Sequence, residues 1–337
     1  MKRKILWLGL SFLLVAALVL ASCGEAAPGE QEEEEEPIKI AFFAGGPPGG
    51  VFGTVVNNGA MAAAEILGSR VEVTTWWSDW STEKMITQFQ EALAMSPDGI
   101  AIMGHPGDEA FEPFVVEARA MGIIITSMNT ALPGLEARFK ADGFGYVGQD
   151  LYDSGYLLGE ATVRKAGLVE GDRVFVWGLK GEPTRGLRTI GVIDAFEAAG
   201  LVVYYLEISP EVNADPAEGI PVIVGHLLSN PDTKAIVTDH GGLTSVLGDY
   251  ITAAGLGPDD IFGAGFDLSP AIVSAIRSGY TDLVLDQQPF LQGFLSVFQI
   301  YLTAKYGFSG LYIDTGAGLI DASNIEAIAP LAEAGYR

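Results

Sequence analysis

Polar side chains that could recognise hydroxyl groups follow several apolar segments of the sequence. Four of them stand just behind the end of such a segment: Asn129, Asp239, Asp267 and Gln287. A fifth, Arg188, ends the loop that follows residues 173–177. Arginine presents a planar fork of N–H donors, a carboxylate only accepts, and an amide does both. Arg188 opens a helical stretch and is the better candidate, whereas Arg185 could equally be a solvated loop residue. Because a hydroxyl both donates and accepts, this set predicts a site for a small, neutral, polyhydroxylated ligand.

Aromatic residues complete the predicted ligand-binding set, which adds Phe52, Trp77 and Phe266. Trp77 lies in a tryptophan cluster that could be either a buried plug or a platform for the apolar face of a sugar ring. Phe52 follows a Gly/Pro-rich loop, residues 45–50, and we expect this loop to deliver it to the site. The loop lacks the Lys-Ser/Thr pair of a nucleotide-binding loop, so nucleotide binding is not expected there.

Catalytic and metal chemistry find little support. The three histidines, His105, His226 and His240, lie far apart without the spacing of metal ligands. The nucleophile motif Gly-x-Ser-x-Gly does not occur in the sequence. A pair of Asp residues could form a glycosidase dyad, but nothing else in the sequence favours that reaction. The sequence therefore predicts a binding protein that is not an enzyme and uses no metal and no cofactor.

The elements that must position these residues alternate in type along the chain. Short apolar runs are separated by amphipathic stretches with helical periodicity, and the runs cover residues 38–43, 71–75, 99–103, 122–126, 173–177, 201–206, 235–238, 261–265 and 282–285. Strands that are apolar throughout predict parallel sheets covered by helices on both faces. In such α/β sheets ligands bind at the carboxyl ends of the strands.

The length and the repetition of this alternation predict two lobes. A chain of 337 residues exceeds the usual size of one domain. The alternation of strand and helix runs through two successive series, which indicates two Rossmann-like, doubly wound α/β lobes. A single closed barrel of strands and helices is the alternative.

The start of the chain resembles a secretory signal. A cationic segment, residues 2–4, precedes an apolar stretch, and Leu20-Ala21-Ser22-Cys23 resembles the lipobox of bacterial lipoproteins. We predict a signal peptide over 1–22, lipidation at Cys23 and an acidic, flexible tether over 23–37. The alternative is an uncleaved transmembrane anchor, because the apolar stretch approaches the length that spans a bilayer. Either arrangement places the remainder outside the cytoplasm and attaches it to the cell membrane.

The charge of the chain argues against nucleic acid as a partner. The formal net charge is −24, and it is spread along the sequence apart from the run Glu32–Glu36. A field of this sign repels phosphate backbones, and the sequence contains no basic patch with interleaved aromatic residues.

Four strings together resemble a known family. They are Ser96-Pro97-Asp98-Gly99-Ile100, Tyr146-Val147-Gly148-Gln149-Asp150, Gly265-Phe266-Asp267-Leu268-Ser269-Pro270 and Asp286-Gln287-Gln288-Pro289-Phe290-Leu291-Gln292-Gly293. These strings resemble the sugar-binding branch of type I periplasmic binding proteins, the ribose-binding and galactose-binding class. The resemblance implies two lobes joined by a three-segment hinge. One lobe would comprise 38–147 with 289–316, and the other 148–288 with 317–337.

The resemblance also implies a function. Members of the family capture a small sugar or polyol between the lobes and deliver it to the permease and ATPase subunits of an ABC importer. We also expect the receptor to be a monomer. Seven of the predicted residues match the family's ligand-binding positions: Phe52, Asn129, Arg188, Asp239, Phe266, Asp267 and Gln287. Ribose-binding members carry Asp-Arg where this chain has Asn129-Thr130, and the tryptophan cluster is outside their pattern. A receptor that presents a sugar-like signal to a membrane sensor and a nucleoside-binding lipoprotein remain the alternatives.

Overall fold

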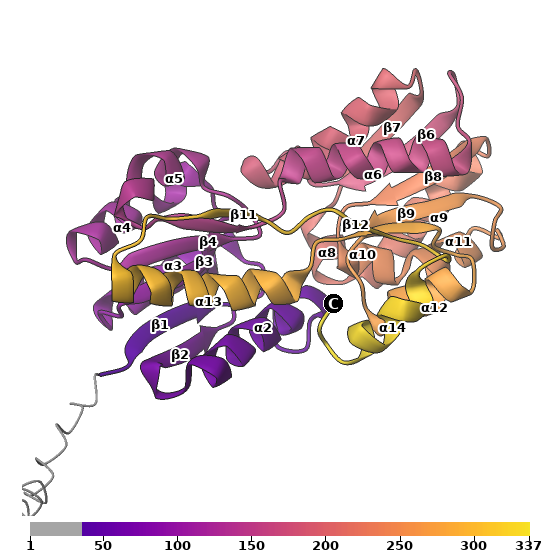
Figure 1. The fold of residues 1–337 in the computed structure, drawn as a ribbon. Coiled ribbons are helices and arrows are strands. Elements are labelled where there is room, and N and C mark those ends of the chain that lie inside the picture. Colours follow the sequence, from indigo (N-terminus) through magenta and orange to yellow (C-terminus); the bar gives the residue numbers. More distant parts are fainter. Residues whose placement is uncertain (1–35) are drawn as a thin grey trace, which may run out of the picture. The chain divides into compact units, whose positions relative to one another are not determined.

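A computed structural model describes residues 36–337 of the chain, which contain two six-stranded sheets (Figure 1). The first sheet has the order β11-β5-β4-β3-β1-β2, and every neighbouring pair of its strands is parallel. Its strands are β1 (Ile38–Phe43), β2 (Val71–Trp76), β3 (Gly99–Met103), β4 (Ile124–Met128), β5 (Gly145–Gly148) and β11 (Tyr312–Asp314). The predicted signal peptide and Cys23 lie outside the described residues. Between residues 36 and 337, we find no helix with the length and apolar character needed to cross a membrane.

The second sheet has the order β12-β10-β9-β8-β6-β7. Its strands are β6 (Arg173–Gly178), β7 (Val202–Glu207), β8 (Thr233–Thr238), β9 (Phe262–Phe266), β10 (Leu283–Asp286) and β12 (Gly318–Ile320). Only β12 runs antiparallel to its neighbour, β10, among the paired strands of this sheet. The prediction of two doubly wound α/β lobes is confirmed, and the alternative of one closed barrel is wrong.

Helices cover both faces of the first sheet, and this is why its two central strands, β3 and β4, are buried at every position. All five residues of β3 and all five of β4 are buried. Figure 1 shows α2 (Val51–Leu67) and α13 (Pro289–Tyr306) in front of the sheet, with α3 (Thr82–Ala94), α4 (Asp108–Ala120) and α5 (Pro133–Phe139) behind it. Strand side chains alternate between the faces, so both sets of helices contribute to the core.

The second lobe follows the same rule. Val174 and Val176 of β6 pack with α6 (Leu151–Ala166) and α7 (Leu187–Ala198) on one side. Phe175 and Trp177, the residues in between, pack with α9 (Ile220–Ser229) and α11 (Leu247–Ala253) on the other. The remaining helices are α8 (Pro210–Ala214), α10 (Gly241–Ser245), α12 (Pro270–Arg277) and α14 (Ile325–Glu333).

The chain passes between the two sheets three times: between β5 and α6, between β10 and α13, and between β11 and β12. Hydrogen bonds join these crossings to one another. Thr315 donates through Oγ1 to the carbonyl of Gln287 at 2.8 Å, and Gln288 donates through Nε2 to the carbonyl of Thr315 at 2.8 Å. Ser154 donates through Oγ to the carbonyl of Gly316 at 2.9 Å. The lobe boundaries given by the resemblance stay a prediction.

Some local elements differ from the sequence-based expectation. The strand predicted at 122–126 is Ile124–Met128, because Gly122 has a φ of +79° and forms the turn that follows α4. No strand was predicted for β5, β11 or β12. The last two have three residues each, so they carry too few residues for a pattern of alternation to be recognised.

Candidate ligand-binding site

Three of the predicted residues form a continuous hydrogen-bonded chain between the two lobes. Asn129, which follows β4, donates through Nδ2 to Oε1 of Gln287 at 2.8 Å. Gln287, which follows β10, donates through Nε2 to Oδ1 of Asp267, and the Asp267 Oδ2 accepts from the backbone N–H of Gly241 at 2.7 Å. All three predicted side chains are buried. The carboxyl ends of strands from both sheets therefore meet at this point.

Backbone conformation directs two of these side chains. Asn129 has a φ of +60° and Asp267 a φ of +73°, so each leaves its strand in the left-handed region. Residues other than glycine adopt this region rarely, and Asn and Asp tolerate it best. Ser269, not Asp267, caps the following helix α12 by accepting from the backbone N–H of Ile272. The Asp267 carboxylate is thus not used as a helix cap, and beyond its bonds to Gln287 and Gly241 it keeps acceptor capacity for a ligand.

Arg188 provides the open donors of the site. It lies in the first turn of α7, is 2% exposed, and its guanidinium lies 4.3 Å from the centroid of the Phe266 ring. Its Nη2 is 3.5 Å from Oδ2 of Asp239. Its Nε and Nη1 are buried and have no hydrogen-bond partner within residues 36–337. Burial, assisted by the neighbouring charge of Arg185, lowers the pKa of Arg188 to about 10, so it remains charged at neutral pH.

Close helix packing positions Arg188. A Cβ atom at Gly155 of α6 would lie 2.0 Å from the carbonyl oxygen of Arg188, closer than real Cβ contacts come. Only glycine lets α6 and the start of α7 approach in this way, and such close packing is a common reason for glycine inside a helix. Gly155 therefore determines how close the backbone of Arg188 lies to α6.

Arg185 corrects one sequence-based interpretation, because it is not a solvated loop residue. It is 3% exposed and forms an ion pair with Asp239 through Nη2, with Nη1 at 3.4 Å from the other carboxylate oxygen. Thr189 also donates to Asp239, at 2.8 Å. Burial alone would raise the pKa of Asp239, but Arg185 and Arg188 outweigh it and hold this pKa well below its ordinary value. The Asp239 carboxylate is occupied by protein donors.

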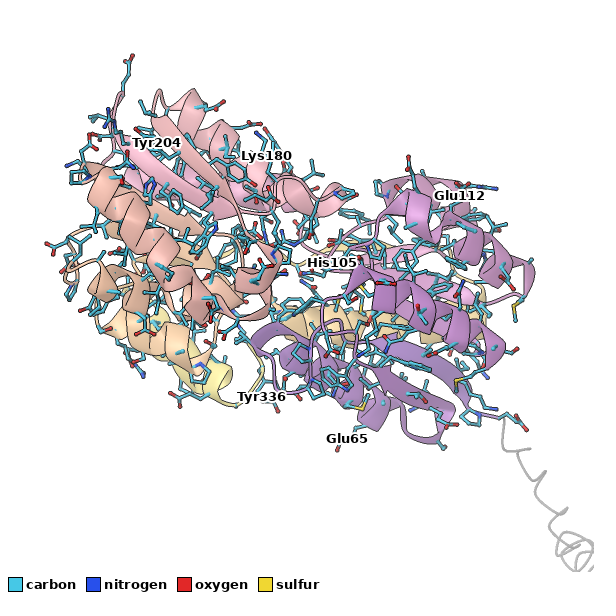
Figure 2. The ribbon with its side chains drawn as sticks, turned by 180° about the vertical axis from the view of Figure 1, so that it is seen from behind. Glu65, His105, Glu112, Lys180, Tyr204 and Tyr336 are labelled. Atoms are coloured by element: carbon cyan, nitrogen blue, oxygen red, sulfur yellow. The ribbon has the colours of Figure 1, made fainter. Side chains whose placement is uncertain are left out.

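Two histidines that were dismissed as metal ligands face this network. His105 follows β3 in the first lobe, and Figure 2 shows it between the lobes; His240 follows β8 in the second. The Nδ1 of His105 and the Nε2 of His240 are buried without a hydrogen-bond partner among the described residues. Because the backbone N–H of Gly242 donates to Nδ1 of His240 at 3.2 Å, the neutral ring carries its proton on Nε2. The open nitrogen of His240 is therefore a donor. Their place directly after a strand was the signal that could have identified both.

The aromatic side of the site is formed by Trp80. Its ring centroid lies 5.8 Å from that of Phe52 and 5.4 Å from that of His105. Trp77, the predicted candidate, packs against the hydrophobic core of the first lobe, as Trp80 also does, but the ring contacts with Phe52 and His105 are those of Trp80. Phe266 lies under Arg188, on the opposite lobe. The structure therefore brings together Phe52, Asn129, Arg188, Asp239, Phe266, Asp267 and Gln287 around the contact between the lobes, and it adds Trp80, His105, Arg185 and His240.

The buried histidines predict loss of stability in acid. Burial, aided by the charges of Arg185 and Arg188, lowers the pKa of His105 to about 3. Burial lowers the pKa of His240 to about 4, against the opposing charge of Asp239. The unfolded chain takes up protons as the pH falls through about 6.5, but the folded protein does not. The histidine contribution is therefore fully present above pH 6.5 and is lost progressively as the pH falls, down to about 4 for His240 and about 3 for His105.

The expected loss is about 1 kcal/mol per histidine at about pH 5.5. Calorimetric melting of the protein and of the variant H105Q/H240N across this range measures it; Asn at position 240 can still accept from Gly242. We expect a shallower fall of the melting temperature in the double variant than in the native protein. Parallel curves would show that these rings are not buried in their neutral form.

Comparison with known proteins agrees with this architecture. Residues 40–307 match the model of the periplasmic binding protein domain family. The xylose/arabinose-binding protein XylF of Sulfolobus acidocaldarius is 30% identical over 262 residues, which cover 73% of this chain and 62% of that protein. This chain thus spans less than two thirds of the length of that relative.

Solved structures share the fold. A carbohydrate transporter from Acidothermus cellulolyticus in complex with myo-inositol has a TM-score of 0.74 at 23% identity, covering 89% of this chain and all of that one. An ABC transporter solute-binding protein from Agrobacterium vitis with bound D-fucose has a TM-score of 0.76 at 20% identity, covering 88% and 99%. With the family model matching most of the chain, this protein belongs to the periplasmic binding protein domain family.

Proposed function

We propose that this protein binds a neutral sugar or cyclic polyol between its two lobes and delivers it to the permease and ATPase of an ABC importer. One observation carries the proposal. Buried donors and acceptors without protein partners come from both lobes at the point where the strand ends meet, namely Arg188 Nε and Nη1, His105 Nδ1 and His240 Nε2, within the described part of the chain. Buried polar groups are almost always hydrogen-bonded, so an unpaired set of this kind calls for a ligand.

The charges favour a neutral ligand. Arg185 balances Asp239, which leaves the Arg188 cation and the Asp267 anion as the remaining charges of the named set. These two charges cancel, so the named set has no net charge to balance with a charged ligand, and hydroxyl groups can accept from Arg188 and donate to Asp267. The names of the relatives, which bind xylose or arabinose, myo-inositol and D-fucose, support a ligand of this kind.

Contacts from both lobes would couple binding to lobe closure. A ligand stabilises the closed arrangement only through extra affinity for that arrangement, and groups divided between His105 in one lobe and Arg188 in the other would provide it. Lipidation at Cys23 after removal of residues 1–22 would hold the receptor at the outer side of the cell membrane, beside its transporter.

A thermal-shift and calorimetric screen of D-xylose, L-arabinose, D-fucose and myo-inositol against the full chain tests the proposal. Binding of at least one should raise the melting temperature in proportion to the logarithm of its concentration. D267A should abolish this shift, because the substitution removes the carboxylate that accepts hydrogen bonds in the site. The unliganded D267A protein should remain folded. If none of the four compounds binds, or if D267A keeps the full shift, the proposed site is wrong.

A further inference from the structure

Trp80 is held in place by the backbone of the loop that follows β1. The backbone N–H of Trp80 donates to the carbonyl of Gly45 at 3.0 Å. Asp79 and Trp80 have φ values of +53° and +57°. A Cβ atom at Gly46 would lie 2.8 Å from Nε1 of the indole, and one at Gly45 would lie 2.5 Å from Cζ3. The indole therefore rests directly on two glycines, where a residue with any side chain would displace it.

The loop that carries Trp80, between β2 and α3, is held in place by contacts with the start of α3. Ser81 caps α3 by accepting from the backbone N–H of Lys84, and Asp79 forms an ion pair with the same lysine at 2.6 Å. Two adjacent residues in the left-handed region are costly unless the surroundings compensate for them, and strain of this kind concentrates at ligand sites. We therefore interpret the strained conformation of Asp79 and Trp80 as a means of positioning the Trp80 indole.

The position of Trp80 links an apolar surface to the polar groups of the site. Its ring lies beside those of both Phe52 and His105, at interplanar angles of 49° and 45°. His105 in turn lies within the electrostatic field of Arg185, Arg188 and Asp239 of the second lobe. The aromatic residues of the first lobe are therefore linked through His105 to the charged groups of the second.

Such a pairing of an apolar surface with polar groups distinguishes ring-shaped ligands from flexible ones. A six-membered ring with equatorial hydroxyls has a flat face of C–H groups and a polar edge, so it can stack on an indole through one and offer hydrogen bonds to polar side chains through the other. An acyclic polyol has the same hydroxyl chemistry but no rigid apolar face, and it loses more conformational freedom on binding.

We propose that Trp80 is a specificity-determining residue that makes the site select a pyranose or cyclitol ring over an acyclic polyol. This inference rests on the proposed function and deepens it. It concerns the ligand class and adds a binding residue that the family resemblance did not supply.

The test compares dissociation constants for D-xylose, myo-inositol and the acyclic xylitol, measured by calorimetry on the full chain and its variants. The native protein should prefer the better of the two rings over xylitol. W80A should weaken binding of that ring about tenfold or more and leave xylitol nearly unchanged, so that the preference disappears. W77A is the matched control, because Trp77 packs against the same core as Trp80, whereas the ring contacts with Phe52 and His105 belong to Trp80. W77A should retain the preference.

The glycine contact supplies a second variant. G46A should reproduce the loss of ring preference without removing the indole, because its Cβ would occupy the place of the Trp80 ring. W80F should also remove the ligand-induced change in tryptophan emission, which W77F should keep. If neither ring binds the native protein, the proposed function fails. If a ring binds and W80A and G46A keep the native ring preference, the function stands and the role of Trp80 is overturned.

Discussion

Replacing Arg188 with methionine is expected to raise the dissociation constant for a bound sugar at least about 100-fold. The guanidinium presents two buried donors, Nε and Nη1, that have no hydrogen-bond partner between residues 36 and 337. Hydrogen bonds from charged groups contribute about 1.5–3 kcal/mol each, so the loss of two amounts to about 3 kcal/mol or more. Isothermal titration calorimetry with a sugar that binds the native protein measures the change.

The same replacement should leave the unliganded protein as stable as before, or more stable. Asp239 keeps its ion pair with Arg185, and methionine retains an apolar stem against the Phe266 ring. Removing a buried cation with few partners relieves a desolvation cost. K180M is the control, because the Lys180 side chain is an exposed cation of the same loop. Native affinity in R188M would show that the Arg188 guanidinium does not contact the ligand.

The general architecture could be predicted because it depends on patterns that recur along the chain. Most strands are short apolar runs, so β3 was placed correctly at both ends and the other strands that were predicted to within a residue or two. Parallel strands also align their carboxyl ends, so residues such as Asn129, Asp267 and Gln287 could be expected to converge from widely separated positions.

Partner choice within the site could not be predicted. Asp239 pairs with Arg185, 54 residues earlier, and no local pattern distinguishes that pairing from contact with a ligand. Likewise, Trp77 and Trp80 belong to one cluster, and their roles separate only because the backbone of the loop turns into the left-handed region at Asp79 and rests on Gly45. His105 was judged by its spacing from other histidines, although its position after β3 carried the useful information.

The pairing of Asp239 leads to the second large effect, which is on stability. D239A should lower the free energy of unfolding by about 3–5 kcal/mol, because it leaves the buried Arg185 and Arg188 guanidiniums without their anion. The exposed pair Arg173–Asp232 of the same lobe is the matched control, and D232A should cost less than about 1 kcal/mol. Urea unfolding followed by circular dichroism measures both.

A double variant separates the charge effect from a simple loss of packing. In R185M/D239L an apolar pair replaces the buried ion pair, so much of the stability lost in D239A should return, since a buried ion pair is worth little more than a well-packed apolar one. Binding should not return in full, because Arg188 then lacks the carboxylate 3.5 Å from its Nη2 that orients the fork. Recovery of stability without recovery of affinity would assign Asp239 to positioning Arg188. A double variant that binds sugar as tightly as the native protein would show that the ion pair serves the fold alone.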